Sequence, residues 1–259
     1  MGETAALRKD ANKGTRPLGA ANEAEASRKV REMFTRIAPR YDLLNHLLSL
    51  QLDRMWRTRT ARILRPILDR QDARILDLCC GTGDLAFALQ RGAKGRVCGA
   101  DFAHTMLVRA KKKSAMFRGG GPGVPFVESD ALRLPFAPES FDLITAAFGF
   151  RNLANYQAGL VEMWRVLKPG GTAAILEFAE PKPGWFGELY RWYFRAVLPR
   201  LGGLISGDRA AYSYLPSSVA RFLQPEELRL LMVENGFAEV EARVWTGGTV
   251  ALHTGVKKL

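Results

Sequence analysis

The sequence predicts an α/β fold built on a mostly parallel sheet, and three observations lead to this prediction. A short apolar run, Ile75 to Cys80, has the length of a buried strand; it ends in Gly81-Thr82-Gly83, and a helical pattern begins at Asp84. Strand-like and helix-like segments then alternate, which is typical of parallel strands joined by right-handed crossovers. Finally, two strand-like segments flank Gly247-Gly248, which is a hairpin signal.

The chain before this sheet is predicted to be helical. Apolar residues recur at helical spacing from Val30 to Leu48, and Pro39 divides them into two short helices. A turn at 49–52 precedes an amphipathic helix from Asp53 to Leu68, whose arginines face outward. The expected strands are 74–79, 96–100, 124–128, 141–147, 171–178, 238–245 and 249–257, and the expected later helices are 84–90, 103–113, 156–166, 184–198 and 224–235.

Composition places the chain among ordinary globular proteins. It has 259 residues, of which 47% are hydrophobic and 25% charged, enough for one α/β domain with an additional segment. The first residues are polar and charged and lack the apolar stretch of a signal peptide, so residues 1–25 are expected to be a disordered tail. Since the sequence has no apolar run of about 18 residues, no membrane-spanning helix is expected.

Charge and cysteine content narrow the expected partners. The net charge of +12 favours a polyanionic partner, either nucleic acid or an anionic membrane surface, and a soluble enzyme with a basic pI is the alternative. The three cysteines, Cys79, Cys80 and Cys98, show neither metal-ligand spacing nor a disulfide framework. We therefore expect no metal site, and free thiols in apolar segments indicate a reducing cytoplasm.

The glycine turn after the first strand indicates the class of ligand. Its spacing is neither that of a dinucleotide fingerprint nor that of a phosphate loop. Asp77, which lies inside the strand, suits a cationic ligand better than a pyrophosphate. The stretch 74–84 resembles motif I of the S-adenosylmethionine-dependent methyltransferases; the alternative is an ordinary turn between a strand and a helix.

The resemblance assigns cofactor contacts to the ends of the strands. Asp101 would accept the ribose hydroxyls, although it would also serve as a cap for the following helix. Phe102 and Met106 would flank the adenine, and Asp130 with the backbone of Ala131 would meet its edge. The remaining contacts, with the methionine part and the sulfonium, are expected from Asp77, Gly81, Thr82, Gly83 and Ala147, the last by its backbone alone.

Three further segments make the resemblance more specific. They are residues 41–45 (Tyr-Asp-Leu-Leu-Asn), 148–152 (Phe-Gly-Phe-Arg-Asn) and 165–171 with Glu177-Phe178. Together with residues 212–219, they resemble the ubiquinone/menaquinone-biosynthesis C-methyltransferases, from about Val30 to Lys257. The chain departs from that pattern in carrying Asp53 where His is frequent and Ala147 where Ser is frequent.

This resemblance implies S-adenosylmethionine-dependent methylation of a ring carbon on a prenylated quinol, with naphthoquinol and benzoquinol both open. The implied fold is a Rossmann-like, seven-stranded sheet with an antiparallel last strand. Residues 26–70 would form a helical lid, and residues 71–259 the cofactor-binding sheet. The implied catalytic residues are Arg151 and Asn152 beside the acceptor and Tyr41 in the lid; a salt bridge for Arg151 and helix packing for Tyr41 are the alternatives.

A mixed aromatic and arginine segment at 184–198 favours contact with a membrane surface or a prenyl tail, and a core helix is the alternative. We thus expect a cytoplasmic enzyme, peripheral on the inner membrane face, with homo-oligomerisation left open. Another phenol or sterol methyltransferase is the second reading, and a non-catalytic cofactor-binding scaffold is a third. A nucleic-acid substrate is not expected, because the chain lacks an Asn-Pro-Pro-Tyr-type motif after the fourth strand.

Overall fold

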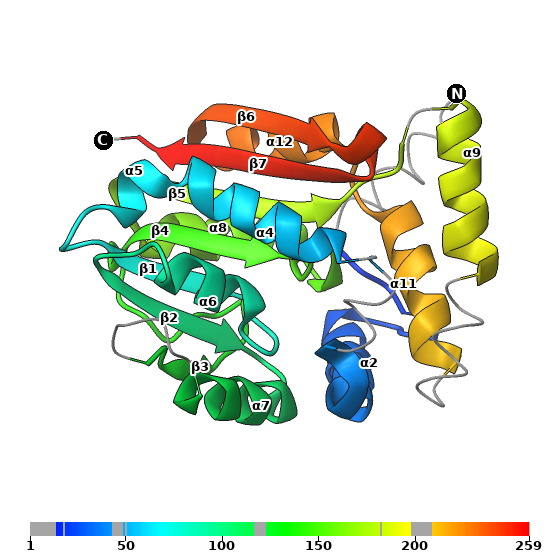
Figure 1. The fold of residues 1–259 in the computed structure, drawn as a ribbon, viewed down its shortest axis with the longest axis horizontal. Coiled ribbons are helices and arrows are strands. Elements are labelled where there is room, and N and C mark those ends of the chain that lie inside the picture. Colours follow the sequence, from blue (N-terminus) through cyan, green and yellow to red (C-terminus); the bar gives the residue numbers. More distant parts are fainter. Residues whose placement is uncertain are drawn as a thin grey trace.

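The protein is a seven-stranded sheet with helices on both faces (Figure 1). A computed structural model describes residues 14–17, 19–42, 49, 51–116, 123–181, 183–197 and 209–258. The strand order is β3-β2-β1-β4-β5-β7-β6. The strands are β1 (Arg74–Leu78), β2 (Arg96–Asp101), β3 (Phe126–Glu128), β4 (Phe141–Ala147), β5 (Leu167–Phe178), β6 (Phe237–Trp245) and β7 (Val250–Lys257). β7 runs antiparallel to its neighbours β5 and β6, and the remaining pairings are parallel. The predicted fold class is confirmed.

The central strands are apolar because both of their faces are covered. Every residue of β4 except Ala147 is buried, and so is β1 after Arg74. Parallel strands between two helical layers read as continuous apolar runs for this reason. Polar residues in these strands have hydrogen-bond partners: the Thr145 hydroxyl donates to Asp77 at 2.7 Å, and Asp142 accepts from Arg70 and Lys168.

The helices that follow the strands begin close to the expected positions. They are α6 (Asp84–Gln90), α7 (His104–Ala115), α8 (Tyr156–Val166) and α12 (Pro225–Glu234). α6 starts directly after Gly83, whose φ of 88° is one that side-chain-bearing residues rarely adopt. The hairpin predicted at Gly247-Gly248 joins β6 to β7.

The N-terminal helical region differs from the prediction in its helix lengths. The helix before Pro39, α2 (Glu23–Ile37), is longer than predicted and leads into a 3₁₀ turn, η1 (Ala38–Arg40), after which residues 41–42 are helical again. Residues 43–48 lie outside the described part. The helix expected over 53–68 is divided into α4 (Leu52–Ile63) and α5 (Arg65–Leu68), because Pro66 cannot continue the backbone hydrogen bonds of α4.

The chain is ordered earlier than the sequence predicts. Residues 1–13 of the expected tail lie outside the described residues, but Thr15 is buried and its N–H donates to Leu153 O at 2.7 Å. An added Cβ on Gly14 would lie 2.1 Å from Ala154 O, so this segment packs backbone against backbone. The boundary expected at residue 25 is therefore too late for the described residues 14–17 and 19–25.

Three helices gather beyond the carboxyl ends of the parallel strands (Figure 1). They are α2, α9 (Trp185–Trp192) and α11 (Arg209–Arg221). The helix expected over 184–198 is α9 followed by a π-helical turn, η3 (Tyr193–Val197); residue 198 is outside the described part. Within the described residues, we find no helix with the length and apolarity needed to cross a membrane.

Candidate active site

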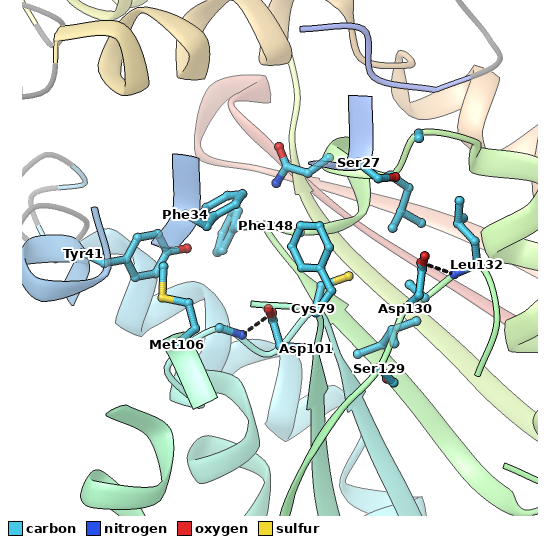
Figure 2. A pocket seen from close by; sticks show the side chains of 18 residues that line it. Ser27, Phe34, Tyr41, Cys79, Asp101, Met106, Ser129, Asp130, Leu132 and Phe148 are labelled. Carbon is cyan, nitrogen blue, oxygen red and sulfur yellow. Dashed lines mark hydrogen bonds between the residues drawn. The ribbon is translucent and has the colours of Figure 1, made fainter. Parts of the chain in front are cut away.

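A cavity of about 640 Å³, counting its open mouth, lies where the sheet meets α2. Its lining comes from the carboxyl ends of β1 to β4 and from the N-terminal helical region. In Figure 2, Phe34 and Tyr41 lie across the cavity from Asp101 and Asp130. A cavity with an apolar lining and a few convergent polar groups is typical of small-molecule sites.

Asp101 is fixed at the end of β2 by two backbone hydrogen bonds. Its carboxylate accepts from Gly81 N–H and from Ala103 N–H, both at 2.8 Å. Asp101 thus fixes the turn before α7 and ties down the glycine loop, but it is not the predicted helix cap, because Ala103 is the N-cap residue and no side chain caps α7. Each oxygen keeps a further lone pair, because a carboxylate has about four acceptor sites. Burial raises the pKa of Asp101 to about 6, and the backbone donors oppose this rise.

The predicted adenine contacts line the same cavity. Asp130 uses Oδ1 to accept from Leu132 N–H at 2.9 Å, which fixes the loop after β3 (Figure 2). Ala131 is buried beside it. Phe102 and Met106, from the start of α7, contribute apolar faces. The cavity therefore brings together two carboxylates with apolar side chains, as the ribose and adenine assignments require.

The glycine loop is held from the N-terminal side. Gly81, at φ 53°, lines the cavity, and an added Cβ there would meet Tyr41 Cε1 at 3.8 Å. The Thr82 hydroxyl donates to Asp42 Oδ1 at 2.5 Å. Lys113 of α7 adds bonds to Thr82, at 3.2 Å, and to Asp42, at 3.3 Å. Thr82 and Gly83 are buried and do not line the cavity in this structure.

Two other residues predicted to contact the cofactor, Asp77 and Ala147, do not line the cavity. Asp77 is 1% exposed, and burial raises its pKa to about 7, with the Thr145 hydrogen bond opposing this rise. Ala147 is the last residue of β4 and pairs with Leu176 of β5. The residues after it, Phe148 and Gly149, line the cavity instead.

Arg151 and Asn152 form the 3₁₀ turn η2 (Phe150–Asn152) after β4, but only Asn152 lines the cavity. The buried Arg151 guanidinium donates to Glu177 Oε1 at 2.7 Å and to Phe148 O at 2.5 Å. The salt-bridge alternative for Arg151 thus holds, and this pair braces the end of β4. Asn152 is 8% exposed, and its Nδ2 is buried without a hydrogen-bond partner among the described residues.

Strained backbone surrounds the cavity. Cys79 and Phe148 have φ values of 53° and 58°, which are unusual for residues with side chains, and both line the cavity. Such conformations cost about 1–3 kcal/mol each and gather at functional sites. Gly149 is required here, because an added Cβ would lie 2.4 Å from Cys79 Cβ.

Some lining residues escaped the sequence prediction. The helical spacing around Val30 indicates that Phe34 faces inward, but not that it meets the strand ends. Cys79 has no cavity role in the sequence analysis, yet it lines the cavity, and burial raises the pKa of its thiol. The other lining residues without an earlier assignment are Ser27, Leu78, Ser129, Leu132, Leu153 and Ala154.

The residues present fit S-adenosylmethionine. The adenosine part matches Asp101, Asp130 and the two apolar side chains of α7, and Gly81 leaves room for close backbone approach. Asp77 has a buried Oδ2 without a hydrogen-bond partner among the described residues, next to the strand end. No group of three or more His, Cys, Asp or Glu side chains in the described ranges is arranged to hold a metal ion.

Comparison with known proteins agrees with this geometry. The sequence model of the ubiE/COQ5 methyltransferase family matches residues 22–257. A demethylmenaquinone methyltransferase from Thermus thermophilus is 50% identical over 224 residues, covering 86% of this chain and 99% of its own. A protein of the same name from Deinococcus radiodurans is 45% identical, and the match covers 93% of this chain and 97% of the relative. Another, from Staphylococcus aureus, is 38% identical, and the match covers 89% of this chain and 93% of the relative.

Solved structures agree on the fold. A methyltransferase from Thermotoga maritima, described as dependent on S-adenosylmethionine, superposes with a TM-score of 0.62 at 21% identity, over 88% of this chain and all of its own. The [4+2]-cyclase SpnF superposes with a TM-score of 0.64 at 18% sequence identity. The match covers 94% of this chain and 100% of the SpnF chain. These likenesses show the fold alone. The sequence relatives and the matched family show more: the chain belongs to the ubiE/COQ5 methyltransferase family, whose members are S-adenosylmethionine-dependent methyltransferases.

Proposed function

We propose that this protein methylates a ring carbon of a prenylated demethylmenaquinol and so forms menaquinol. The observation that carries the proposal is the 50% identity, over nearly the whole length of the relative, to a demethylmenaquinone methyltransferase. Two further relatives with that name, at 45% and 38% identity, favour a naphthoquinol over a benzoquinol.

We assign the cofactor to the cavity at the ends of β1 to β4. When bound, S-adenosylmethionine supplies an electrophilic methyl group. Asp101 accepts hydrogen bonds from the ribose, and Asp130 and Ala131 meet the adenine edge. Thr82, held by Asp42 and Lys113, keeps the glycine loop in shape around the methionine part, and Gly83 lets the chain turn into α6. The buried Asp77 and the backbone of Ala147 support this end from behind.

The acceptor ring is expected beside η2 and Tyr41. A ring carbon becomes nucleophilic once a neighbouring hydroxyl loses its proton, and donors that face the oxygen favour the ionised form. Asn152 Nδ2 is such a donor, since it is buried at the cavity without a partner among the described residues. With the cofactor bound, its methyl group would pass to this ring carbon as the bond to sulfur breaks, and the ring would then release a proton to solvent.

We assign Arg151 a positioning role through Glu177 and Phe148, because its guanidinium is engaged by both. We further propose that residues 26–70 act as a lid over the sheet of residues 71–259. Tyr41 lines the cavity, and the neighbouring Asp42 bonds to the glycine loop, which supports this division.

Assay of the purified protein tests the function. Reduced demethylmenaquinone in detergent micelles and labelled S-adenosylmethionine should give labelled menaquinol, detected by mass spectrometry. Asp101→Asn is the matched loss-of-binding control. Methylation of only a benzoquinol would reassign the substrate. Methylation of a phenol or sterol but of neither quinol would favour the second reading, and tight cofactor binding without any transfer would favour a scaffold.

We also propose that α9 docks on a membrane surface, where a prenylated quinol resides. Trp185, Leu189 and Trp192 are 79%, 54% and 61% exposed, and their i, i+4, i+7 spacing places them on one side of α9. Apolar and aromatic side chains on one helix face are typical of interfacial binding, and the net charge of +12 would add attraction to anionic lipid.

A further inference from the structure

A chain of hydrogen bonds runs from the N-terminal segment to the cavity wall. The hydroxyls of Thr15 and Tyr214 are 2.9 Å apart, and the Tyr214 hydroxyl donates to Asn152 Oδ1 at 3.0 Å. These residues come from the segment before α2, from α11 and from η2, so three distant parts of the sequence converge here. This series of hydrogen bonds, Thr15–Tyr214–Asn152, is called the relay below. It ends at Asn152, which lines the cavity.

The position of Tyr214 decides which end of the Asn152 amide meets the cavity. With Oδ1 taken by the Tyr214 hydroxyl, the NH₂ group is the end without a partner among the described residues. A buried donor without an acceptor costs about 1–3 kcal/mol of folding free energy. A ligand in the cavity that supplies the acceptor removes this cost, which favours binding of that ligand. The amide therefore selects an oxygen that accepts, and disfavours a group that donates.

The N-terminal segment is built to hold Thr15 in place. Thr15 N–H donates to Leu153 O, and Arg16 Nη1 donates to Ala154 O, both at 2.7 Å. From the other side, Arg221 at the end of α11 donates to Arg16 O at 3.1 Å. Hydrogen bonds thus fix the segment both to the residues that follow Asn152 and to the helix that carries Tyr214.

We propose that Tyr214, backed by Thr15, is a positioning residue that presents the Asn152 NH₂ group to the ring oxygen of the acceptor. The substrate class is an aromatic ring with an ionised hydroxyl next to the carbon to be methylated, and in this respect the inference rests on the proposed function. The N-terminal segment becomes part of the acceptor site, although it touches neither the cofactor carboxylates nor the glycine loop in the described contacts.

The environment keeps Tyr214 in the required protonation state. Burial raises the pKa of its hydroxyl, and the bond with Thr15 and the charge of Arg151 oppose this. The hydroxyl therefore remains a donor through the neutral range. Among the neighbouring charges, Arg151 is paired with Glu177, so the relay lies beside an ion pair with no net charge.

Enzyme kinetics test the relay. Tyr214→Phe should lower kcat about tenfold or more, the equivalent of one lost hydrogen bond to a charged group, with cofactor Kd within about twofold. Thr15→Val should have a smaller effect in the same direction, and Thr15→Ser, which keeps the hydroxyl, should restore activity. Tyr156→Phe is the matched control, because that hydroxyl is also buried but donates to Arg151 O.

A double-mutant cycle separates positioning from general stability. If Tyr214 acts through Asn152, adding Tyr214→Phe to Asn152→Ala should lower kcat little further. Effects that multiply, or a Tyr214→Phe loss that only matches the thermal destabilisation of Tyr156→Phe, would overturn the proposal.

A spectroscopic readout does not depend on the substrate. The side-chain amide signal of Asn152 in ¹⁵N-labelled protein, assigned by its loss in Asn152→Asp, should shift in Tyr214→Phe and Thr15→Val but not in Tyr156→Phe. An unchanged signal would overturn the relay even if the quinol is methylated. Shifted signals without quinol methylation would place the failure in the proposed function instead.

Discussion

The Thr82 hydroxyl in the glycine loop donates a hydrogen bond to Asp42 of the N-terminal helical region at 2.5 Å. The same region supplies Tyr41 to the cavity, so one contact links the lid that we propose to the glycine loop. Lys113 reinforces this link, because its Nζ bonds to Thr82 and Asp42 and, at 2.5 Å, to Asp84 at the start of α6.

Removing the Lys113 charge should loosen the lid. In Lys113→Met the carboxylates of Asp42 and Asp84 lose a shared cation, and we expect about 1 kcal/mol less stability for the closed arrangement. Trypsin should then cleave faster around η1, and cofactor Kd should rise. Lys112→Met, at an exposed neighbouring position, is the control. Equal cleavage rates in the two variants would contradict the link.

The cofactor should bind less tightly in acid. Burial raises the pKa of Asp101 to about 6, and the ionised form is the better acceptor for ribose hydroxyls. Kd should therefore rise as the pH falls below about 6, approaching tenfold per unit. Isothermal calorimetry from pH 5 to 8 measures this. In Asp101→Asn, binding should be weaker and nearly independent of pH, and a wild-type Kd that is flat with pH would oppose the ribose assignment.

The stability of the unliganded protein should respond to pH in the opposite sense. Folding raises the pKa of Asp77 to about 7 and of Asp101 to about 6, so the folded state binds protons more readily than the unfolded chain, whose Asp pKa is about 3.9. This contribution is fully present below about pH 4 and is lost as the pH rises through 6 to 7. Asp77→Asn should remove much of this pH dependence in thermal unfolding, measured against wild type.

The Arg151–Glu177 pair should behave as a structural unit. Arg151→Ala leaves a buried carboxylate without its partner, and we expect a loss of about 3–5 kcal/mol in the free energy of unfolding. The double variant Arg151→Met, Glu177→Gln should recover much of that loss. Denaturant titration checks this, and kcat measured on the double variant shows how much of the activity depends on the charge itself. Full recovery of stability with kcat still depressed would restore a direct catalytic role for Arg151.

The exposed face of α9 should bind anionic vesicles. We expect sedimentation with vesicles at low salt, release at high salt, and several-fold weaker binding in Trp185→Ser, Trp192→Ser, because partly inserted aromatic side chains bury apolar area. Leu230→Ser, Val233→Ser removes exposed apolar side chains from α12 and is the matched control. If both double variants bind like wild type, α9 is not the docking surface.

Local chemistry made much of the fold predictable. The βα alternation and the Gly247-Gly248 turn give the strands, since apolar runs and glycines act over a few residues. Prolines were harder to place: the helix before Pro39 is longer than predicted, and Pro66 breaks the helix expected over 53–68.

The sequence predicted site residues correctly where they lie at or just after the carboxyl end of a strand. Asp101 ends β2, Asp130 and Asn152 lie in the loops that leave β3 and β4, and all three line the cavity. Arg151 also follows its strand, yet it turns inward, because Glu177 on the next strand offers a buried partner, a pairing that no local pattern reveals. The contacts of Thr15 and Asp42 join segments far apart in sequence, and a single sequence carries no signal for them.

The place of β7 between β5 and β6 sets an order of events in folding. β6 and β7 are joined by a short turn, so they can pair early, on the time scale of an isolated hairpin. Pairing of β7 with β5, for example Val256 with Thr172, closes a far longer loop and should come later. Until then β5 keeps an open edge flanked by apolar residues such as Ile175 and Leu176, which are buried in the finished sheet. By pairing with β5, the β6–β7 hairpin protects this edge from pairing with strands of other molecules. A refolding chain is therefore most prone to aggregate in the interval before the hairpin docks.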